Sequence, residues 1–323
     1  MILLLPGAYA EESYRLGNGI QLGKTPLYLG GYFSLDYWHN LKGTSELELD
    51  EASVMLYGNH GAWGMMAEVE FTDAYRRRFG FNAETTSDLT PHTERVFIYY
   101  EPSEYYRVSV GKFNTPVGYW NKMPINVLRD TTSSPRIVEV IFPRYTTGLN
   151  MKYTGENSGA NLLIQATPDL DSAFSAKDIY NNFDIEKQFG LGVQFRQERW
   201  SFGMNAGGYE ERIEEEKWGY LYASAQYRSE QTHVMAETGY RRNEKNMRSN
   251  YGGYLQGTQL IYAQQFVVMR LEYTTEYIQN SEDSSAVIGY VYRPLFPVAV
   301  KGEYQFHSHE NEDILIVSFS MLF

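Results

Sequence analysis

The side chains best suited to act on a solute are charged, and they form two sets. Opposing basic and acidic groups along a water-filled passage between low-dielectric walls create a field that sorts ions, without breaking a covalent bond. The first set lies in a proline-rich segment, 113–144: Lys122, Arg129, Asp130, Arg136, Glu139 and Arg144. The second set follows one face of runs with alternating polarity: Arg95, Arg107, Lys152, Arg196, Arg270, Lys301, Glu237, Glu272 and Glu303.

Residue patterns for covalent or metal chemistry are missing from the sequence. The chain has no Cys, and no G-x-S-x-G, H-E-x-x-H or phosphate-binding loop motif occurs in it. Of six His, only His233 and His307 alternate with the charged face, and neither has a neighbouring Ser as a nucleophile. Acidic stretches at 210–216 and 307–313 are expected to be solvated surface. We predict no enzyme activity, no metal site and no cofactor.

Strands must position these charges, because alternation with a period of two residues recurs from about residue 25 to the last residue. The pattern predicts sixteen strands. They are expected at 27–37, 47–57, 63–72, 93–101, 105–112, 146–153, 161–167, 188–197, 200–208, 218–228, 232–241, 252–262, 266–277, 285–293, 298–307 and 313–323.

The connections between these strands alternate between long and short. Segments such as 73–92, 113–144 and 168–186 are long, whereas EPSE, GENSG and QERW are tight turns. Membrane β-barrels have short turns at one end and longer loops at the other. The segment 113–144 is the third long connection, and a loop of this length is commonly functional. We expect it to fold into the mouth of the barrel.

Periodicity alone leaves open which face of each strand meets lipid, since a soluble barrel would alternate in the same way. Three features favour lipid outside and water inside: the loop alternation, the terminal Phe323, and a secretory-type A-x-A site at 8–10. We interpret 1–10 as a signal-peptide remnant and 11–323 as one barrel domain. Aromatic residues at strand ends are expected to form the interfacial girdles: Tyr37, Tyr100, Tyr153, Trp200, Trp218, Tyr277 and Tyr292.

The overall charge bears on partners. A net charge of −12 argues against nucleic acid as a partner. No run of eighteen apolar residues is present, so the sequence predicts no transmembrane helix.

Two stretches resemble a known family. The terminal run DILIVSFSMLF resembles the assembly signal of Gram-negative outer-membrane proteins. The segment VGKFNTPVGYWN, continued by PRIVEVIFPRYTTGL, is similar to the constriction-loop region of general porins and of phosphate-selective porins of the O and P type. The resemblance implies an all-β transmembrane barrel of about sixteen strands, a homotrimer, and passive diffusion of small solutes. It also implies contact with outer-membrane lipid and lipopolysaccharide, and recognition of the last strand by the barrel assembly machinery.

The sequence therefore predicts an outer-membrane porin whose third long loop sets selectivity. Because the loop basics outnumber its acids by four to two, we expect a weak preference for anions. The alternative for these six loop charges is that several of them are solvated or hold the loop to the barrel wall by ion pairs. The alternative function is a structural or adhesive surface protein that uses the barrel as an anchor.

Overall fold

A computed structural model describes residues 14–41, 43–80, 82–170, 181–245, 248–276, 281–308 and 313–323. The proposed signal-peptide remnant at 1–10 and the girdle residue Tyr277 lie outside these ranges. No helix within them is long and apolar enough to cross a membrane.

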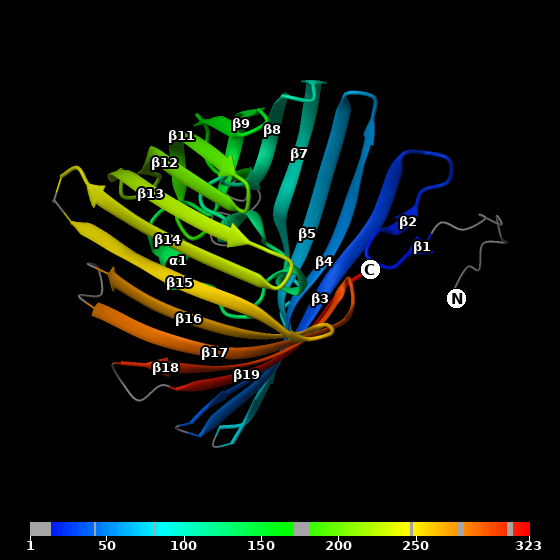
Figure 1. Cartoon of the computed structure of the whole chain (residues 1–323), viewed down its shortest axis with the longest axis vertical. Coiled ribbons are helices and arrows are strands. Elements are labelled where there is room, and N and C mark those ends of the chain that lie inside the picture. Colours follow the sequence, from blue (N-terminus) through cyan, green and yellow to red (C-terminus); the bar gives the residue numbers. More distant parts are fainter. Residues whose placement is uncertain are drawn as a thin grey trace.

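Sixteen long antiparallel strands form one closed barrel (Figure 1). Their bounds are β3 (Leu27–Asn40), β4 (Thr44–His60), β5 (Trp63–Phe79), β7 (Pro91–Ser103), β8 (Tyr106–Asn114), β9 (Tyr145–Thr154), β10 (Ser158–Gln165), β11 (Ile185–Gln197), β12 (Trp200–Glu211), β13 (Lys217–Arg228), β14 (Thr232–Asn243), β15 (Ser249–Tyr262), β16 (Gln265–Glu276), β17 (Ser281–Leu295), β18 (Val298–His307) and β19 (Ile314–Leu322). Three short strands accompany them: β1 (Tyr14–Arg15), β2 (Gly19–Gln21) and β6 (Glu84–Thr86).

The barrel closes where β19 pairs with β3. The register runs from Ile314 opposite Asn40 to Leu322 opposite Tyr32. Beyond the last paired residues, the amide and carbonyl of Phe323 exchange hydrogen bonds of 2.8 and 2.9 Å with Gly31. Closure leaves no unpaired sheet edge between the first and last long strands, which is a condition for a sheet in lipid.

Several strands extend further than alternation predicts. β4 begins at Thr44 and β5 continues to Phe79, so the hairpin passes through charged sequence. Across this extension the Arg76 Nε lies 2.6 Å from a Glu48 carboxylate oxygen, and Arg78 makes the same contact with Glu46. Cross-strand ion pairs of this kind replace apolar contacts as the reason for pairing.

The exposure of the side chains shows which face of the sheet lies outside the barrel and which lies inside. Large apolar side chains on the outer face are open, with Phe189 58%, Met204 65% and Met269 60% exposed. The alternate positions point inward and include buried charges such as Glu237 and Arg270. Apolar groups outside and polar groups inside are the arrangement of a barrel whose solvent is lipid.

Candidate functional site

The segment between β8 and β9, residues 115–144, is called here the inner loop, because its hydrogen bonds reach inward-facing side chains of strands all around the barrel. It contains two short 3-10 helices, η1 (Trp120–Lys122) and η2 (Asn126–Leu128), and one helical turn, α1 (Arg136–Val140). Pro135 precedes α1 at φ −63° and ψ 133°, the extended geometry that starts a helix. The prolines thus divide the loop into short pieces that cannot form a strand.

Carboxylates of the wall accept hydrogen bonds from the loop backbone. Glu303 on β18 accepts from the amides of Thr132 at 3.1 Å and Ser133 at 2.9 Å. Glu272 on β16 accepts from the amide of Arg136 at 2.9 Å. Glu237 on β14 accepts from the amide of Tyr119. Each carboxylate satisfies amides that irregular backbone would otherwise leave unpaired in a partly buried site.

Basic side chains of the wall bind the loop from the other direction. Arg270 on β16 donates to the Thr131 hydroxyl at 2.9 Å and to the carbonyl and hydroxyl of Ser133 at 2.9 and 2.8 Å. Lys301 on β18 donates to the backbone carbonyl of Asn126 and, at 2.6 Å, to its side-chain oxygen. Arg270 and Lys301 are only 1% and 2% exposed, so they are anchors of the loop and not groups in contact with passing solute.

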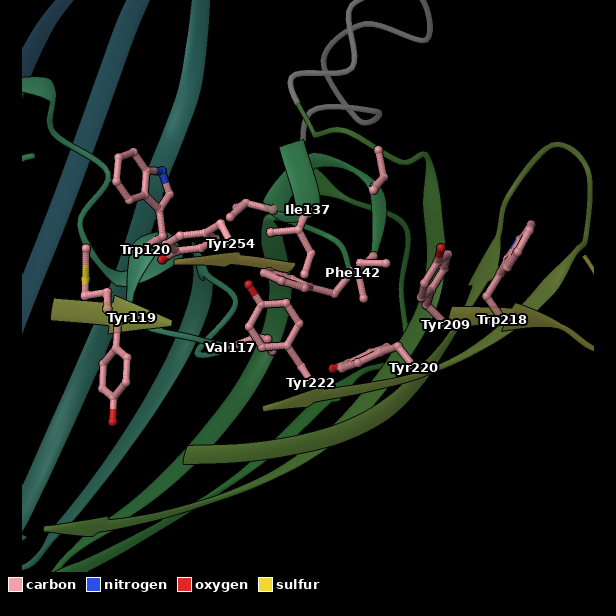
Figure 2. Close-up of a cluster of buried hydrophobic side chains, with 14 of the residues drawn as sticks. Val117, Tyr119, Trp120, Ile137, Phe142, Tyr209, Trp218, Tyr220, Tyr222 and Tyr254 are labelled. Carbon is pink, nitrogen blue, oxygen red and sulfur yellow. The ribbon is translucent and has the colours of Figure 1, made fainter. Parts of the chain in front are cut away.

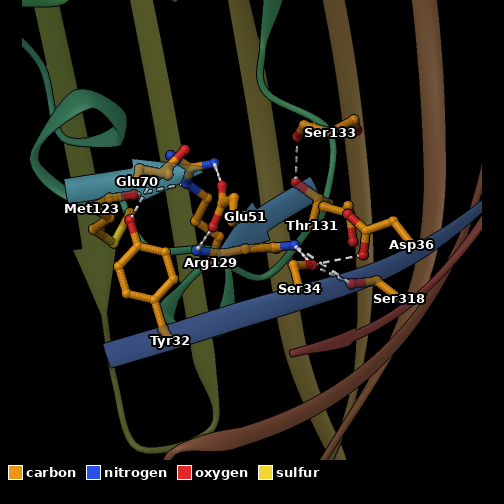
Figure 3. Close-up of polar contacts among 12 residues, drawn as sticks. Tyr32, Ser34, Asp36, Glu51, Glu70, Met123, Arg129, Thr131, Ser133 and Ser318 are labelled. Atoms are coloured by element: carbon orange, nitrogen blue, oxygen red, sulfur yellow. Dashed lines mark hydrogen bonds and ion pairs between the residues drawn. The ribbon is translucent and has the colours of Figure 1, made fainter. Parts of the chain in front are cut away.

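One loop residue joins the two strands at which the barrel closes. The Asn126 side-chain amide donates to Ser34 on β3 at 2.7 Å and lies 3.4 Å from the Ser318 hydroxyl on β19. Figure 3 shows Ser34 and Ser318 side by side, with Asp36 next to them. The inner loop therefore spans the closing seam from within.

The charges of the inner loop are mostly paired. Arg129 donates to the Met123 carbonyl at 2.7 Å and lies 3.8 Å from Glu51, as Figure 3 shows. Asp130 lies 3.5 Å from Arg293 and accepts from Thr258 at 2.9 Å.

The remaining loop charges divide into a pair and two exposed cations. Arg144 and Glu139 lie 3.5 Å apart. Arg136 and Lys122 are exposed. Among the described residues, Lys122 has no carboxylate within ion-pair distance, and its ammonium lies 5.7 Å from the centroid of the Tyr119 ring.

A hydrophobic cluster fills one side of the interior (Figure 2). Trp120, Ile137 and Phe142 of the inner loop pack against Tyr222 and Tyr254 of the wall, and the Phe142 and Tyr222 rings meet edge to face with centroids 5.1 Å apart. The other labelled members are Val117, Tyr119, Tyr209, Trp218 and Tyr220. The inner loop is thus held by a core of its own inside the barrel.

This cluster corrects one expectation and adds residues that the sequence reading missed. Trp218, expected in an interfacial girdle, is 3% exposed and belongs to the cluster. Its strand reads WGYLYASA from 218 to 225, with weak polarity on either face. That lack of contrast is the signal that something apolar covers the inner face. Trp200, Tyr100, Tyr153 and Tyr292 are exposed, as a girdle requires.

Beside the cluster lies a cavity of about 400 Å³, called here the basic cavity. It is bounded by the inner loop and by β7 to β13. Its charged lining is entirely basic: Arg95, Arg107, Lys122, Lys152 and Arg196. Four of these were wall candidates and one was a loop candidate, so the structure brings together members of both sets.

The five cations differ in pairing. Arg95 forms an ion pair with Glu68, and Arg107 lies 2.5 Å from a Glu101 oxygen. Within the described residues, Lys122, Lys152 and Arg196 have no carboxylate partner. Arg196 donates to the Gly155 carbonyl at 3.1 Å. Three basic groups from the loop, β9 and β11 thus face one water-accessible space.

Lys112 falls on the outward-facing parity of its strand, and the structure shows how it is accommodated. It stays within β8, next to Gly111 at φ +132°, a conformation that side chains rarely adopt. Its ammonium is fully buried, 3.6 Å from Asp169 and 5.0 Å from the Tyr145 ring centroid. The distorted backbone turns the charge away from lipid.

Two clusters of three glutamates have carboxylate oxygens close enough to one another to share a cation. The first is buried and consists of Glu68, Glu70 and Glu94; the second consists of Glu211, Glu214 and Glu216. In the first group, the Tyr32 hydroxyl lies 2.8 Å from oxygens of both Glu70 and Glu94. Glu94 enters this group because the β5–β7 register shifts between Glu68 and Val69, which alternation could not reveal.

No protein-family model and no curated protein matches the sequence. Solved structures do match. OmpT of Vibrio cholerae with loop L8 deleted, described as an outer membrane protein, has a TM-score of 0.66 at 10% identity, covering 92% of this chain and 99% of that one. OmpF of Salmonella typhi, in a complex with daunomycin, has a TM-score of 0.67 at 9% identity, covering 92% and 97%.

A mutant of the Rh. blastica porin has a TM-score of 0.57 at 12% identity, covering 92% of this chain and all of that one. At these identities the likeness concerns the fold. The predicted sixteen-stranded barrel of the porin type is confirmed.

Proposed function

We propose that the chain is a porin of the Gram-negative outer membrane, through which small hydrophilic solutes diffuse passively, with a weak preference for anions. The observation that carries the proposal is the basic cavity, a water-accessible space lined, among the described residues, by five basic and no acidic side chains. Charge of one sign between low-dielectric walls raises the local concentration of counter-ions. The apolar outer face supports insertion in lipid.

The basis of the anion preference differs from the loop count of the sequence. Four of the six loop charges are held in ion pairs, which cancel much of their field. Lys122, Lys152 and Arg196 supply the preference instead. Arg136, which is exposed, remains a candidate on the loop.

Partners follow from the same proposal. The outer face would contact membrane lipid and, in its extracellular part, lipopolysaccharide. The last strand, ending at Phe323, would be recognised by the barrel assembly machinery. A homotrimer is supported by the likeness to OmpT of Vibrio cholerae, one structure of which is described as a trimer form.

Planar-bilayer recording tests the function. The purified protein should produce stepwise currents, and in a salt gradient the reversal potential should indicate anion preference. Arg136→Glu is expected to move that potential toward cations, and an unchanged potential would remove Arg136 from the pore. If the correctly folded barrel produced no current, the proposed channel function would be refuted.

A second candidate function, a barrel that anchors a surface structure without transport, is favoured by the hydrophobic cluster, which fills part of the interior. The same recording separates the two, because a plugged anchor passes no current. The basic cavity supports the channel, since an anchor has no need of unpaired charges in contact with water.

A further inference from the structure

We propose that the basic cavity is a saturable binding site for small polyhydroxylated anions, such as sugar acids or sugar phosphates. This inference rests on the proposed channel function and names a solute class for it.

The charges reach the cavity from the inner loop and from the barrel wall. Lys122 comes from the inner loop, Lys152 from β9 and Arg196 from β11. Since none of them has a carboxylate partner in the described part of the chain, their charge is available to an anion. Basic groups from three elements can bind two oxygens of one carboxylate or phosphate at once.

The neutral lining distinguishes an organic anion from chloride. Side-chain amides and hydroxyls share the cavity with the cations: Ser109, Asn150, Asn161, Gln194, Asn205 and Ser224. A halide accepts hydrogen bonds and donates none, so amide oxygens are of no use to it. A sugar hydroxyl both donates and accepts, which matches a side-chain amide.

One acceptor in the cavity has no donor. The Asn150 side-chain oxygen is buried and accepts no hydrogen bond from any residue that the structure describes. A buried acceptor without a partner costs about 1–3 kcal/mol, and a solute hydroxyl would remove that cost. This atom is therefore an independent sign that the site is completed by a donor from outside the chain.

The space is kept open by glycine. A Cβ at Gly192 would lie 2.2 Å from the Asn161 oxygen and 2.4 Å from the Asn205 nitrogen, and one at Gly203 would lie 2.5 Å from the Ser224 hydroxyl. A larger residue would displace these polar groups from the cavity. Its volume of about 400 Å³ falls in the range of small-molecule sites.

Block of the chloride current in planar bilayers tests the proposal with matched probes. Gluconate and hexanoate share a six-carbon carboxylate chain, and only gluconate carries hydroxyls on carbons 2 to 6. Gluconate should block at a concentration about tenfold lower than hexanoate, because hydroxyl contacts worth about 1.4 kcal/mol give that factor. Glucose should block weakly. Glucose 6-phosphate shows whether phosphate serves as well as carboxylate.

Variants assign the block to the cavity. Lys152→Gln combined with Arg196→Gln should raise the half-blocking gluconate concentration by about 10–100-fold, as expected for lost charge-assisted hydrogen bonds. Asn150→Leu should make the half-blocking concentrations of gluconate and hexanoate similar. Gln194→Leu removes another amide of the lining and tests the same preference for hydroxyls if Asn150→Leu fails to fold. The control is Lys187→Gln, whose side chain is 57% exposed and pairs with Glu210.

The outcomes separate the inference from the channel itself. A silent protein overturns the proposed function. A conducting channel that gluconate and hexanoate block equally, or whose block is unchanged by the cavity variants, overturns the binding site and leaves the channel standing.

Discussion

Arg270 provides the sharpest test of the distinction between anchoring and selectivity. Alternation places it on the inner wall, where it could be expected to shape the field of the pore. The structure instead buries it under the inner loop with three hydrogen bonds to Thr131 and Ser133, and 3.3 Å from Glu272. Arg270→Met keeps most of the volume and removes all three donors. We expect it to loosen the loop and to change ion preference little.

The magnitude follows from the contacts. Removing one partner of a buried, hydrogen-bonded charge pair costs about 3–5 kcal/mol, because the other partner is left uncompensated. At 1.36 kcal/mol per factor of ten, the equilibrium between docked and undocked 131–133 should shift by about 10²–10⁴. Glu303 still accepts from the amides of Thr132 and Ser133, and Lys301 still binds Asn126, so the whole loop should not detach. Local, repeated opening is the expected result.

Open-channel noise in single-channel records reports such opening directly. Arg270→Met should raise the noise and add brief conductance steps, while its reversal potential stays near that of the wild type. Lys152→Gln is the matched comparison, since it should shift the reversal potential and leave the noise unchanged. The opposite pattern, a shifted potential with quiet openings in Arg270→Met, would refute the assignment of Arg270 as an anchor.

Three further outcomes are expected. Trp120→Ala removes a buried side chain from the hydrophobic cluster, which should lower the free energy of unfolding by about 3–5 kcal/mol. The variant should have a higher conductance and admit larger neutral sugars in liposome swelling. An unchanged size limit would contradict the role of the cluster. The Lys122 side chain is open to the water of the basic cavity but enclosed by the barrel, and this partial desolvation lowers its pKa to about 8, an effect that Glu237 opposes and Lys152 reinforces. Because a lysine is charged below its pKa, anion preference should decline as the pH rises through about 8, and Lys122→Gln should abolish that decline. Gly31 lies on β3 at the closing seam, and a Cβ there would be 2.3 Å from the Ser53 carbonyl oxygen of β4. Gly31→Ala should therefore lower the urea concentration at the midpoint of unfolding. Gly302→Ala should leave it unchanged, because a Cβ at Gly302 would have no described atom within 4 Å.

The sequence was sufficient for the strands because their signal is local. Each inward or outward position is decided by its immediate neighbours, as the alternation of Phe189, Leu191 and Val193 with Gly190 and Gly192 shows. An even number of strands makes β19 antiparallel to β3, so that the two can pair and close the barrel. Strand ends were less predictable. The run DAYRRRF at 73–79 has no regular apolar alternation, and β5 continues through it because Arg76 and Arg78 pair with Glu48 and Glu46 of β4.

The site was predictable only in part, because it depends on the path of the inner loop. Inner-face parity places Arg270 and Lys301 on the inner face, and both side chains are buried in the structure. Parity cannot show that these two side chains contact Ser133 and Asn126 instead of water, because the irregular backbone of the inner loop has no repeating pattern of polarity. Lys152 and Arg196 stay open to water because the loop passes beside them, which again only the fold determines.

The contact of Asn126 with Ser34 and Ser318 has a consequence for the order of assembly. The two hydroxyls belong to strands far apart in the chain, and they become neighbours only when β3 and β19 pair. Before closure, Asn126 can reach only one of the two hydroxyls, and after closure it can reach both. Loop docking and barrel closure reinforce each other, so the last step of folding also completes the pore.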